Sequence, residues 1–444
     1  MAWTARLVAA ATLVALAAAG ISAQERLTVT RAVQDALLHN ASLRAARAAV
    51  AETAEQESAA HAAWFPRLSV AESWQRSNQP VFVFSSLLSS RQFTASNFAI
   101  DALNHPDPIG FFHTSVGLDE VVFDYGRRPA IDAAALQREI AGFAVDETAA
   151  TVALTTTQTF ARVLTSEAGR RAADADLRAA IEDHARAGRR RDAGLATEAD
   201  VLALAAHVAD LRQRVIQAEG ETAIARAELN RLMGAPLDWS YEIAEPVELV
   251  RRDASTESLE ALLTEADTAR PELRRAAAAE RLAEAGRSRA RGALVPQVAA
   301  QAALDVSGTQ FNDRTSAWLV GGVLRWNFSL GGAEVAQARA AAQASARAKA
   351  ETEDARAAVH VEVVTALRRL ETARARQTVA RAAVDQARES QRIIRDRYES
   401  GMAGVTDVLR ASGAVLDAEN QRVSTVVDAM VAEAMLRRSV GRQP

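Results

Sequence analysis

The sequence predicts a mostly α-helical chain with a membrane β-barrel portion, built from a duplicated unit of short helix, β-hairpin and long helical hairpin. Two matches predict the duplication: residues 190–202 resemble residues 397–409 without a gap, and Gly234 matches Gly441 at the same offset of 207 residues. A match that keeps its register over this distance indicates an internal repeat. In each half, moreover, the apolar period changes from about 3.6 to 2 after a proline, which indicates a helix followed by a strand.

We expect the first 23 residues to be a secretory signal peptide. Arg6 precedes an apolar run at residues 7–19, and Ala23 supplies a small residue at the expected cleavage site. The run is too short for a stable transmembrane helix, although an ordinary buried helix is the alternative. The chain has no cysteine, which excludes disulfides, thiolate metal sites and a lipid-bearing cysteine. We therefore expect an exported chain without a lipid anchor.

Each half then begins with a short helical segment. The first segment spans residues 24–65, with a helix expected from about 28 to 63, and the second spans residues 258–295. Pro66 and Pro296 follow these segments at an offset of 230 residues. Proline ends a helix because it lacks the amide donor and clashes with the preceding turn.

After each proline the apolar residues alternate as in strands with one apolar and one polar face. Residues 66–125 and 296–330 are therefore expected to form two β-hairpins, with runs of about 11 residues that fit tilted strands crossing a bilayer. A small soluble sheet is the alternative. In the second hairpin the expected apolar face holds Val298, Ala300, Ala302, Leu304, Val306, Trp318, Val320, Leu324 and Trp326, and the expected polar face holds Gln297, Gln301, Asp305 and Arg325.

The first hairpin is longer than the second by about 25 residues, as expected for the outer loop of a membrane hairpin. The extra residues include the turn-rich stretch 104–108 and the apolar stretch 80–84. His105 and His113 lie in this region without the cysteine or carboxylate spacing of a metal site, so we expect them at the surface.

Residues 126–234 and 331–441 are expected to form two long helical hairpins, joined through a linker at residues 235–257. No proline interrupts residues 130–193 or 333–400, and a helix of about 65 residues extends roughly 100 Å. Steps of three and four residues alternate along both hairpins, which indicates coiled-coil seams. The seam residues are Val201, Leu204, Val208, Leu211, Val215, Ala218, Thr222, Ala225, Leu229 and Leu232 in the first hairpin, and Val359, Val363, Ala366, Leu370, Ala373, Gln377, Ala380 and Val384 in the second.

The four predicted strands cannot close a barrel alone. Open strand edges in a bilayer leave backbone groups unpaired, at several kcal/mol each. Two copies would give eight strands with an interior filled by side chains, and three copies would give 12 strands with room for a channel. We therefore expect several copies to assemble.

Composition excludes several functional classes. The net charge is −4 and no basic face is apparent, so a nucleic-acid partner is not expected. The sequence contains no Gly-x-Ser-x-Gly, His-Glu-x-x-His or phosphate-loop motif and no cysteine nucleophile. We expect no catalysis, no cofactor and no metal site.

Taken together, these features resemble the TolC family of outer-membrane efflux ducts. The specific motifs are the Phe-x-x-Gly exits at 123–126 and 328–331 and the Gly-x-x-x-x-x-Asp-Val-Leu turns that begin at Gly194 and Gly401. The resemblance implies a homotrimer, with a 12-stranded barrel in outer-membrane lipid continued by an α-helical barrel in the periplasm. It also implies partnership with a periplasmic membrane-fusion adaptor and an inner-membrane transporter, as the passive exit duct of a tripartite efflux pump or type I secretion system. A periplasmic coiled-coil adaptor or scaffold is the alternative.

The resemblance assigns roles to the two turns. Tyr398, Asp200 and Asp407 correspond to residues that close the pore entrance, and Arg410 lies where it would neutralise a ring of Asp407 carboxylates. Simple capping of the returning helices is the alternative role for the two aspartates. Small residues at the turns would let another backbone approach closely. The tips that adaptor hairpins would contact are Gly194, Leu195, Ala196, Thr197, Gly401, Met402, Ala403 and Gly404.

Overall fold

The structure is a computed structural model that describes residues 26–243, 257–327 and 329–442. The predicted signal peptide at 1–23 lies outside the described residues, and so does most of the predicted linker at 235–257. The described chain is mostly helical, as predicted. None of the helices in this part of the chain combines the length and the apolar character that crossing a membrane requires.

The chain divides into two compact units. One contains residues 49–141 and 275–352, and the other contains residues 1–48, 142–274 and 353–444. Each unit thus draws on both halves of the duplicated sequence.

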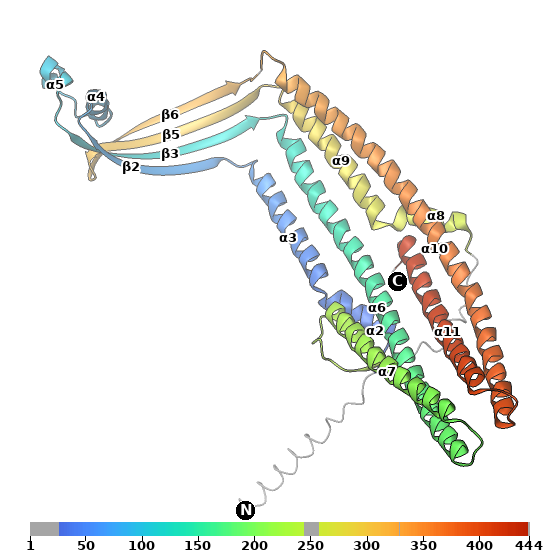
Figure 1. The fold of residues 1–444 in the computed structure, drawn as a ribbon. Helices are drawn as coiled ribbons and strands as arrows, with labels where there is room; N and C mark the ends of the chain where they lie inside the picture. Colours follow the sequence, from blue (N-terminus) through green and yellow to red (C-terminus); the bar gives the residue numbers. More distant parts are fainter. Residues whose placement is uncertain (1–25, 244–256, 328, 443–444) are drawn as a thin grey trace, which may run out of the picture. The chain divides into compact units, whose positions relative to one another are not determined.

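The sheet of the first of these units has four antiparallel strands, in the order β2-β3-β5-β6 (Figure 1). Strands β3 and β5 pair along most of their lengths and so join the two halves of the sequence. Strands β2 and β6 form the two edges. The strands are β2 (Arg67–Ser77), β3 (Ile109–Phe123), β5 (Gln297–Gln310) and β6 (Asp313–Arg325).

One face of this sheet is apolar and open to its surroundings. The register pairs Val70 with Val116, Val116 with Leu304 and Leu304 with Trp318, which places these four side chains in one row across the sheet. Val70, Leu304 and Trp318 are exposed and Val116 is half-buried, with Trp318 78% and its neighbour Val320 72% exposed. The opposite face carries serine, glutamine, aspartate and arginine side chains, among them Gln301 and Asp305 of β5 and Arg325 of β6.

The turn-rich loop expected between the first two strands contains helices instead, so that expectation is wrong. They are α4 (Pro80–Ser89), the 3₁₀ helix η1 (Ala95–Phe98) and α5 (Ile100–Asn104). Pro80 occupies the first turn of α4, where its missing amide costs nothing. Phe93 packs edge-on against Phe84 at 4.7 Å and against Phe98 at 5.0 Å between ring centroids. These tertiary contacts stabilise helices too short to persist alone.

The other unit is built from helices that pair along their lengths. Apart from α4, η1 and α5, the helices of the described residues are α2 (Val29–His39), α3 (Ala41–Ala62), α6 (Arg127–Asp192), α7 (Glu198–Met233), α8 (Leu259–Ala269), α9 (Pro271–Gly292), α10 (Ala333–Glu399) and α11 (Val405–Ser439), of which most of α3 and α9 belongs to the first unit. Burial confirms the predicted seams: in α7 and α10 nearly all of the seam residues are buried, and Val215, Ala218 and Gln377 are half-buried. A short parallel pairing of β1 (Arg26–Leu27) with β4 (Glu242–Ile243) adds to a core around Phe160 and Leu229.

The helical segment expected over residues 28–63 forms two short helices, α2 and α3. Thr28 caps α2 through Arg31 N, at 3.2 Å. The helix then ends because Asn40 adopts an extended backbone conformation, and its side chain starts α3 by accepting a hydrogen bond from Ser42 N at 2.9 Å. The buried Asn40 side chain also donates to Leu232 O at 3.0 Å.

The corresponding segment of the second half, expected as one helix, is likewise split into α8 and α9. Arg270 is extended at the break. It precedes Pro271, whose ring disfavours the helical conformation of the residue before it. The equivalent breaks in the two halves lie at an offset of 230 residues.

Candidate functional site at the hairpin ends

The two predicted turns close the ends of two helical hairpins, α6–α7 and α10–α11 (Figure 1). Gly194 has φ 73° and Gly401 has φ 77°, both in the left-handed region that favours glycine. At the first turn Gly194 N donates to Arg191 O and Leu195 N to Arg190 O, each at 2.8 Å. The second turn repeats this pattern of paired hydrogen bonds, which is the Schellman motif.

Both glycines are required by backbone conformation and not by crowding within the chain. Apart from its two chain neighbours, a Cβ atom added to Gly194 or Gly401 would meet no atom of the described residues within 4 Å. The residues after the glycines are apolar and exposed, with Leu195 at 69% and Met402 at 68%. Ala196 and Ala403, the next residues in each turn, are half-buried. The predicted tips therefore present small and apolar surface at both hairpin ends.

Asp200 caps the returning helix α7. Its carboxylate accepts hydrogen bonds from Thr197 N at 3.0 Å and Thr197 Oγ1 at 2.8 Å, and Asp200 N donates to Thr197 Oγ1 at 3.2 Å. This reciprocal pair is a capping box. The Thr197 amide, and after it the hydroxyl, hold the pKa of Asp200 below its usual range.

Asp407 occupies the same place at the start of α11. Its Oδ2 accepts from Gly404 N at 3.2 Å. Gly404 has no side chain to return the bond, so this cap has only one of the two contacts of the box at Asp200. The other oxygen accepts from Arg410 Nη1 at 3.4 Å, with 76% of the Arg410 side chain exposed. The capping role that we considered as an alternative is therefore present at both aspartates.

Polar contacts tie the two hairpin ends together through α6 and α10. The guanidinium of Arg190 lies 4.9 Å from the centre of the half-buried Tyr398 ring, a cation–π contact. Arg186 pairs with Glu399 at 3.1 Å, and Arg395 pairs with Asp183 at 3.8 Å. We refer to these three contacts as the hairpin ties.

A small apolar cluster lies beside the hairpin ties. Ala187, Val201 and Leu204 are buried there, and Val405 and Leu409 pack against them. Of the residues in this region, the sequence singled out the aspartates, Arg410, Tyr398 and the tip residues. The charged partners of the ties carry no such signal, because arginine and glutamate are frequent all along the solvated faces of these helices.

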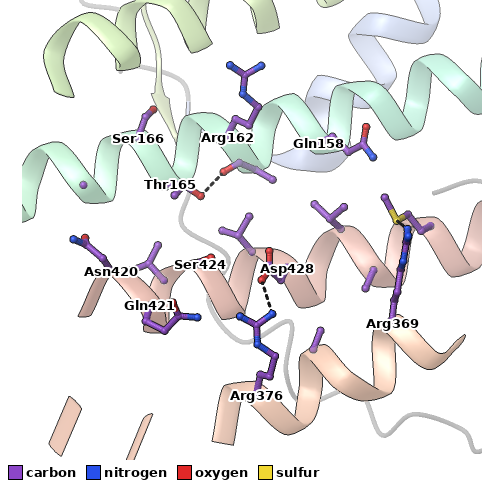
Figure 2. A pocket seen from close by; sticks show the side chains of 18 of the residues that line it. Gln158, Arg162, Thr165, Ser166, Arg369, Arg376, Asn420, Gln421, Ser424 and Asp428 are labelled. Atoms are coloured by element: carbon purple, nitrogen blue, oxygen red, sulfur yellow. Dashed lines mark hydrogen bonds and ion pairs between the residues drawn. The ribbon is translucent and has the colours of Figure 1, made fainter. Parts of the chain in front are cut away.

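Another feature that the sequence did not predict is a groove of 1840 Å³ farther along the same helices, between α6, α7, α10 and α11. Figure 2 shows that Arg376 of α10 and Asp428 of α11 point toward each other, at 3.6 Å, across part of this groove. The other labelled side chains are amides, hydroxyls and arginines. In the described residues no group of three or more histidine, aspartate or glutamate side chains is placed to hold a metal ion. Apolar side chains, among them Ile224, Val427 and Met435, also line the groove between the hairpins.

Solved structures with the same fold were found for almost the whole chain. A membrane protein from Pseudomonas aeruginosa is 20% identical, with a TM-score of 0.79 and 93% of each chain covered. The outer membrane protein VceC from Vibrio cholerae is 18% identical, with a TM-score of 0.75 and coverage of 93% of this chain and 96% of that one. The CmeC outer membrane channel of Campylobacter jejuni is 15% identical, with a TM-score of 0.80 and coverage of 93% and 85%. At these identities the likeness establishes the fold alone.

The family comparison covers both halves of the duplicated chain. A search of curated protein sequences finds no match. The profile of the family described as outer membrane efflux protein, by contrast, matches residues 32–235 and 262–442. These ranges include both hairpin turns and all four strands of the sheet. The chain therefore belongs to the outer membrane efflux protein family, the TolC family that its duplicated motifs resemble.

Proposed function

We propose that this chain forms a homotrimeric channel-tunnel in the outer membrane and acts as a passive exit duct for a tripartite efflux pump or type I secretion system. The observation that carries the proposal is the four-stranded sheet. Its apolar face is exposed, its opposite face is polar, and its edge strands β2 and β6 have no partner among the described residues. A soluble scaffold would bury the apolar face, whereas a membrane barrel exposes it to lipid.

Pairing of β6 of one copy with β2 of the next removes the open edges. Three copies give 12 strands and an interior wide enough for a channel. The extent of the apolar face fits this arrangement, since Trp318 of β6 and Trp326 just after it lie eight residues apart, roughly 26 Å along the strand at 3.3 Å per residue. At the strand tilt of about 35–45° in outer-membrane barrels this separation is about 19–22 Å along the membrane normal, which fits within their apolar band of about 25 Å.

The apolar band ends at a polar cluster on the side of the β5–β6 turn. Arg314 pairs with Glu72 at 3.1 Å and donates to Thr114 at 2.7 Å, next to the row that contains Val70 and Trp318. The Arg314 guanidinium also lies 4.1 Å from the centre of the Phe311 ring. Arginine and aromatic side chains are suited to the headgroup level. We place this end of the sheet at the cell exterior.

The hairpin ends then form the periplasmic entrance. Around a threefold axis, three copies of Asp407 would make an acidic ring that attracts cations, and Arg410 at 3.4 Å would offset part of its charge. Asp200 and Tyr398 contribute to the same closed end, where the hairpin ties hold α6 against α10. Opening requires these ties to break.

The apolar tips provide the surface for a periplasmic membrane-fusion adaptor, which would link the duct to an inner-membrane transporter. The adaptor would contact Leu195 and Met402, the exposed apolar residues of the two turns. Their glycines leave space beside them, because a Cβ added to Gly194 or Gly401 would meet no atom of the described residues other than its chain neighbours within 4 Å. Replacing either glycine with a bulky residue is expected to abolish export while trimers persist.

A pair of adjacent substitutions in β6 tests the membrane assignment. Val320 lies on the apolar face and Leu319 on the polar face, and both are more than half exposed. Val320→Arg lies between the interface and the midplane, where an arginine costs about 0–1 and 2–4 kcal/mol respectively, so it is expected to cost about 1–2 kcal/mol per protomer and to reduce assembly. Leu319→Arg faces the aqueous interior and is tolerated. Outer-membrane fractions, the number of subunits in mild detergent and pore formation in planar bilayers are measured for each.

The expected result for the unaltered chain is a detergent-extracted trimer that conducts. A chain released without detergent, or a monomer in mild detergent, would refute the proposal. Equal assembly of the Val320→Arg and Leu319→Arg chains would also refute it, because a soluble sheet exposes both side chains to water.

A further inference from the structure

The helical segment between β2 and β3, residues 78–108, folds onto the polar face of the sheet. Thr315 pairs with Ser307, which lies two residues along β5 from Asp305. Thr315 and Ser307 are therefore on the same polar face as Asp305. Its hydroxyl donates to Ser89 O, in the last turn of α4, at 2.9 Å. The contact places the end of α4 over the polar face at the β5–β6 turn.

An aromatic contact fixes the start of α4 on the same face. Phe82 packs edge-on against Phe111, at 6.1 Å between ring centroids. Phe111 stacks on His113, the next residue on the same face of β3. The Nδ1 atom of His113 forms a hydrogen bond with Ser307 Oγ at 2.9 Å. Both ends of α4 therefore contact the face that is turned away from lipid in the proposed barrel.

The segment is held in place by specific contacts. Arg91, soon after α4, has φ 54° and is the only non-glycine residue in the described chain with a positive φ. Its guanidinium donates to Ser316 O at 3.2 Å. Gln92 donates to Asp313 at 3.2 Å and accepts from Thr309 Oγ1 at 2.7 Å. Such a strained residue persists only where surrounding contacts determine it. The segment is thus an ordered part of the unit.

The outer surface of this segment is apolar. Val81 is 74%, Leu88 50%, Phe98 64% and Ile100 77% exposed. Between residues 78 and 104 the only charged side chains are those of Arg91 and Asp101. Exposed apolar surface of this kind is typical of a site that another protein surface covers.

We propose that the three copies of this segment meet at the threefold axis and constrict the outer mouth of the channel. This inference rests on the proposed trimeric barrel. Twelve tilted strands spaced about 4.8 Å apart give a backbone radius of about 12 Å. A helix with its side chains is about 10–12 Å across. An α4 helix seated on the inner face of each third of the wall therefore reaches the axis, where the apolar side chains of neighbouring copies cover one another.

Access from outside the cell tests this constriction. The chain contains no cysteine, so Gln301→Cys introduces a single thiol on the polar face of β5. A maleimide carried on a polymer too large to cross the outer membrane is added to intact cells that express the full chain. In a second chain an Asn-Gly turn replaces residues 78–108, which suits the paired positions of Ser77 and Ile109. We expect labelling of Gln301→Cys to be at least about tenfold faster in the shortened chain.

Two further variants make the result decisive. Asn312→Cys, in the exposed β5–β6 turn, is expected to be labelled equally with and without the segment. The Val81→Asp, Ile100→Asp double variant keeps the segment but brings like charges together at the axis, so it is expected to accelerate labelling at Gln301→Cys without shortening the hairpin. Trimer content is measured in the same samples.

The outcomes separate the two proposals. Equal labelling of Gln301→Cys in all chains, whether fast or absent, would overturn the constriction while labelled Asn312→Cys and intact trimers leave the proposed duct standing. Absence of trimers, or an Asn312→Cys thiol that is never labelled from outside, would instead refute the proposed duct. A constriction formed by another bound protein would appear as labelling that slows only when cell-surface proteins are present, and purified trimers in vesicles would then label fast.

Discussion

Removal of the Tyr398 ring is expected to open the periplasmic entrance. The ring lies under the Arg190 guanidinium at 4.9 Å and is half-buried beside the apolar cluster of Val405 and Ala187. A cation–π contact at a partly exposed site contributes about 0.5–1 kcal/mol, and the half-buried ring contributes about 1–2 kcal/mol from its apolar area. Tyr398→Ala therefore destabilises the tied arrangement by about 2 kcal/mol in each protomer.

The effect on opening depends on how many protomers loosen together. Since 1.4 kcal/mol is a factor of ten, the loss in one protomer favours opening by roughly 25-fold, and concerted loss in three protomers favours it by about 10⁴-fold. Tyr398→Phe is the matched control. It keeps the ring under Arg190 and removes only the hydroxyl, so its conductance is expected to stay within about twofold of the unaltered chain.

The assay is the closed-state conductance of reconstituted trimers in planar bilayers. Exposed ion pairs are screened by salt, so the Arg186–Glu399 and Arg395–Asp183 pairs are expected to weaken as salt rises. We therefore divide each closed-state conductance by the conductivity of the bulk solution. As salt rises, this ratio for the unaltered chain should approach the ratio for Tyr398→Ala. An unchanged closed-state conductance for Tyr398→Ala would refute the role of the ring. An increase of the same size for Tyr398→Phe would show that the hydroxyl, and not the ring, closes the entrance.

Three predictions concern stability. Asp200→Asn is expected to lower the melting temperature slightly at neutral pH, since it weakens a cap worth about 0.5–1 kcal/mol. Because the folded pKa of Asp200 is lowered, the stability that its carboxylate contributes is complete above the unfolded pKa near 4 and is lost as pH falls through the folded pKa. The melting temperatures of the variant and the unaltered chain should therefore converge in acid. Gly234→Ala is expected to destabilise by more than about 1 kcal/mol because φ is 69° and the added Cβ would lie 2.9 Å from His39, whereas Gly413→Ala in the open middle of α11 should be neutral or stabilising by denaturant titration. Asn40→Ala is expected to lower the free energy of unfolding by about 2 kcal/mol, because it removes one helix cap and leaves one buried carbonyl unpaired. Glu52→Ala, at an exposed position, is the control in the same denaturant titration. An equal loss of stability in the control would contradict this account.

The parts of the fold that the sequence predicted correctly depend on local periodicity. The seam from Val359 to Val384 is readable because a coiled coil repeats its buried positions every three or four residues. Strand β6 is readable because alternation of apolar and polar residues puts Trp318 and Val320 on one face. In both cases the residues themselves carry the pattern, and no distant partner is needed to recognise it.

The parts that the sequence did not predict depend on distant partners. The helix break at Asn40 is stabilised by the carbonyl of Leu232, 192 residues away. The helical segment between the first two strands is stabilised by Asp313, Thr315 and other residues more than 200 positions away. The tie between Arg190 and Tyr398 is equally distant, and one arginine among many gives no signal of its partner.

The two halves also satisfy the same backbone groups with different chemistry. Asn40 donates to the carbonyl of Leu232, the second-last residue of α7, and Arg270 donates to that of Arg438, the second-last residue of α11, at 3.1 Å. Arg270 is only 3% exposed and also pairs with Glu362 at 2.7 Å. Removing one partner of a fully buried ion pair costs about 3–5 kcal/mol, and the cost here is smaller because the Glu362 side chain is 39% exposed. The amide in the first half needs no such counter-charge, so the two positions cannot be exchanged without altering their neighbours.

Differences of this kind explain why the repeat is visible mainly at its turns. A buried carbonyl accepts a hydrogen bond from several side chains, so the residue type at such a position is free to differ between the halves. A backbone at φ near +70° tolerates few residues other than glycine. Gly194 and Gly401 meet this requirement at the hairpin ends, and Gly234 and Gly441 meet it where each returning helix stops. At Gly234 and Gly441 an added Cβ would also lie within 3 Å of the end of the preceding short helix, at His39 and at Ala269. The glycines are therefore the positions at which the geometry of the duplicated unit determines the residue.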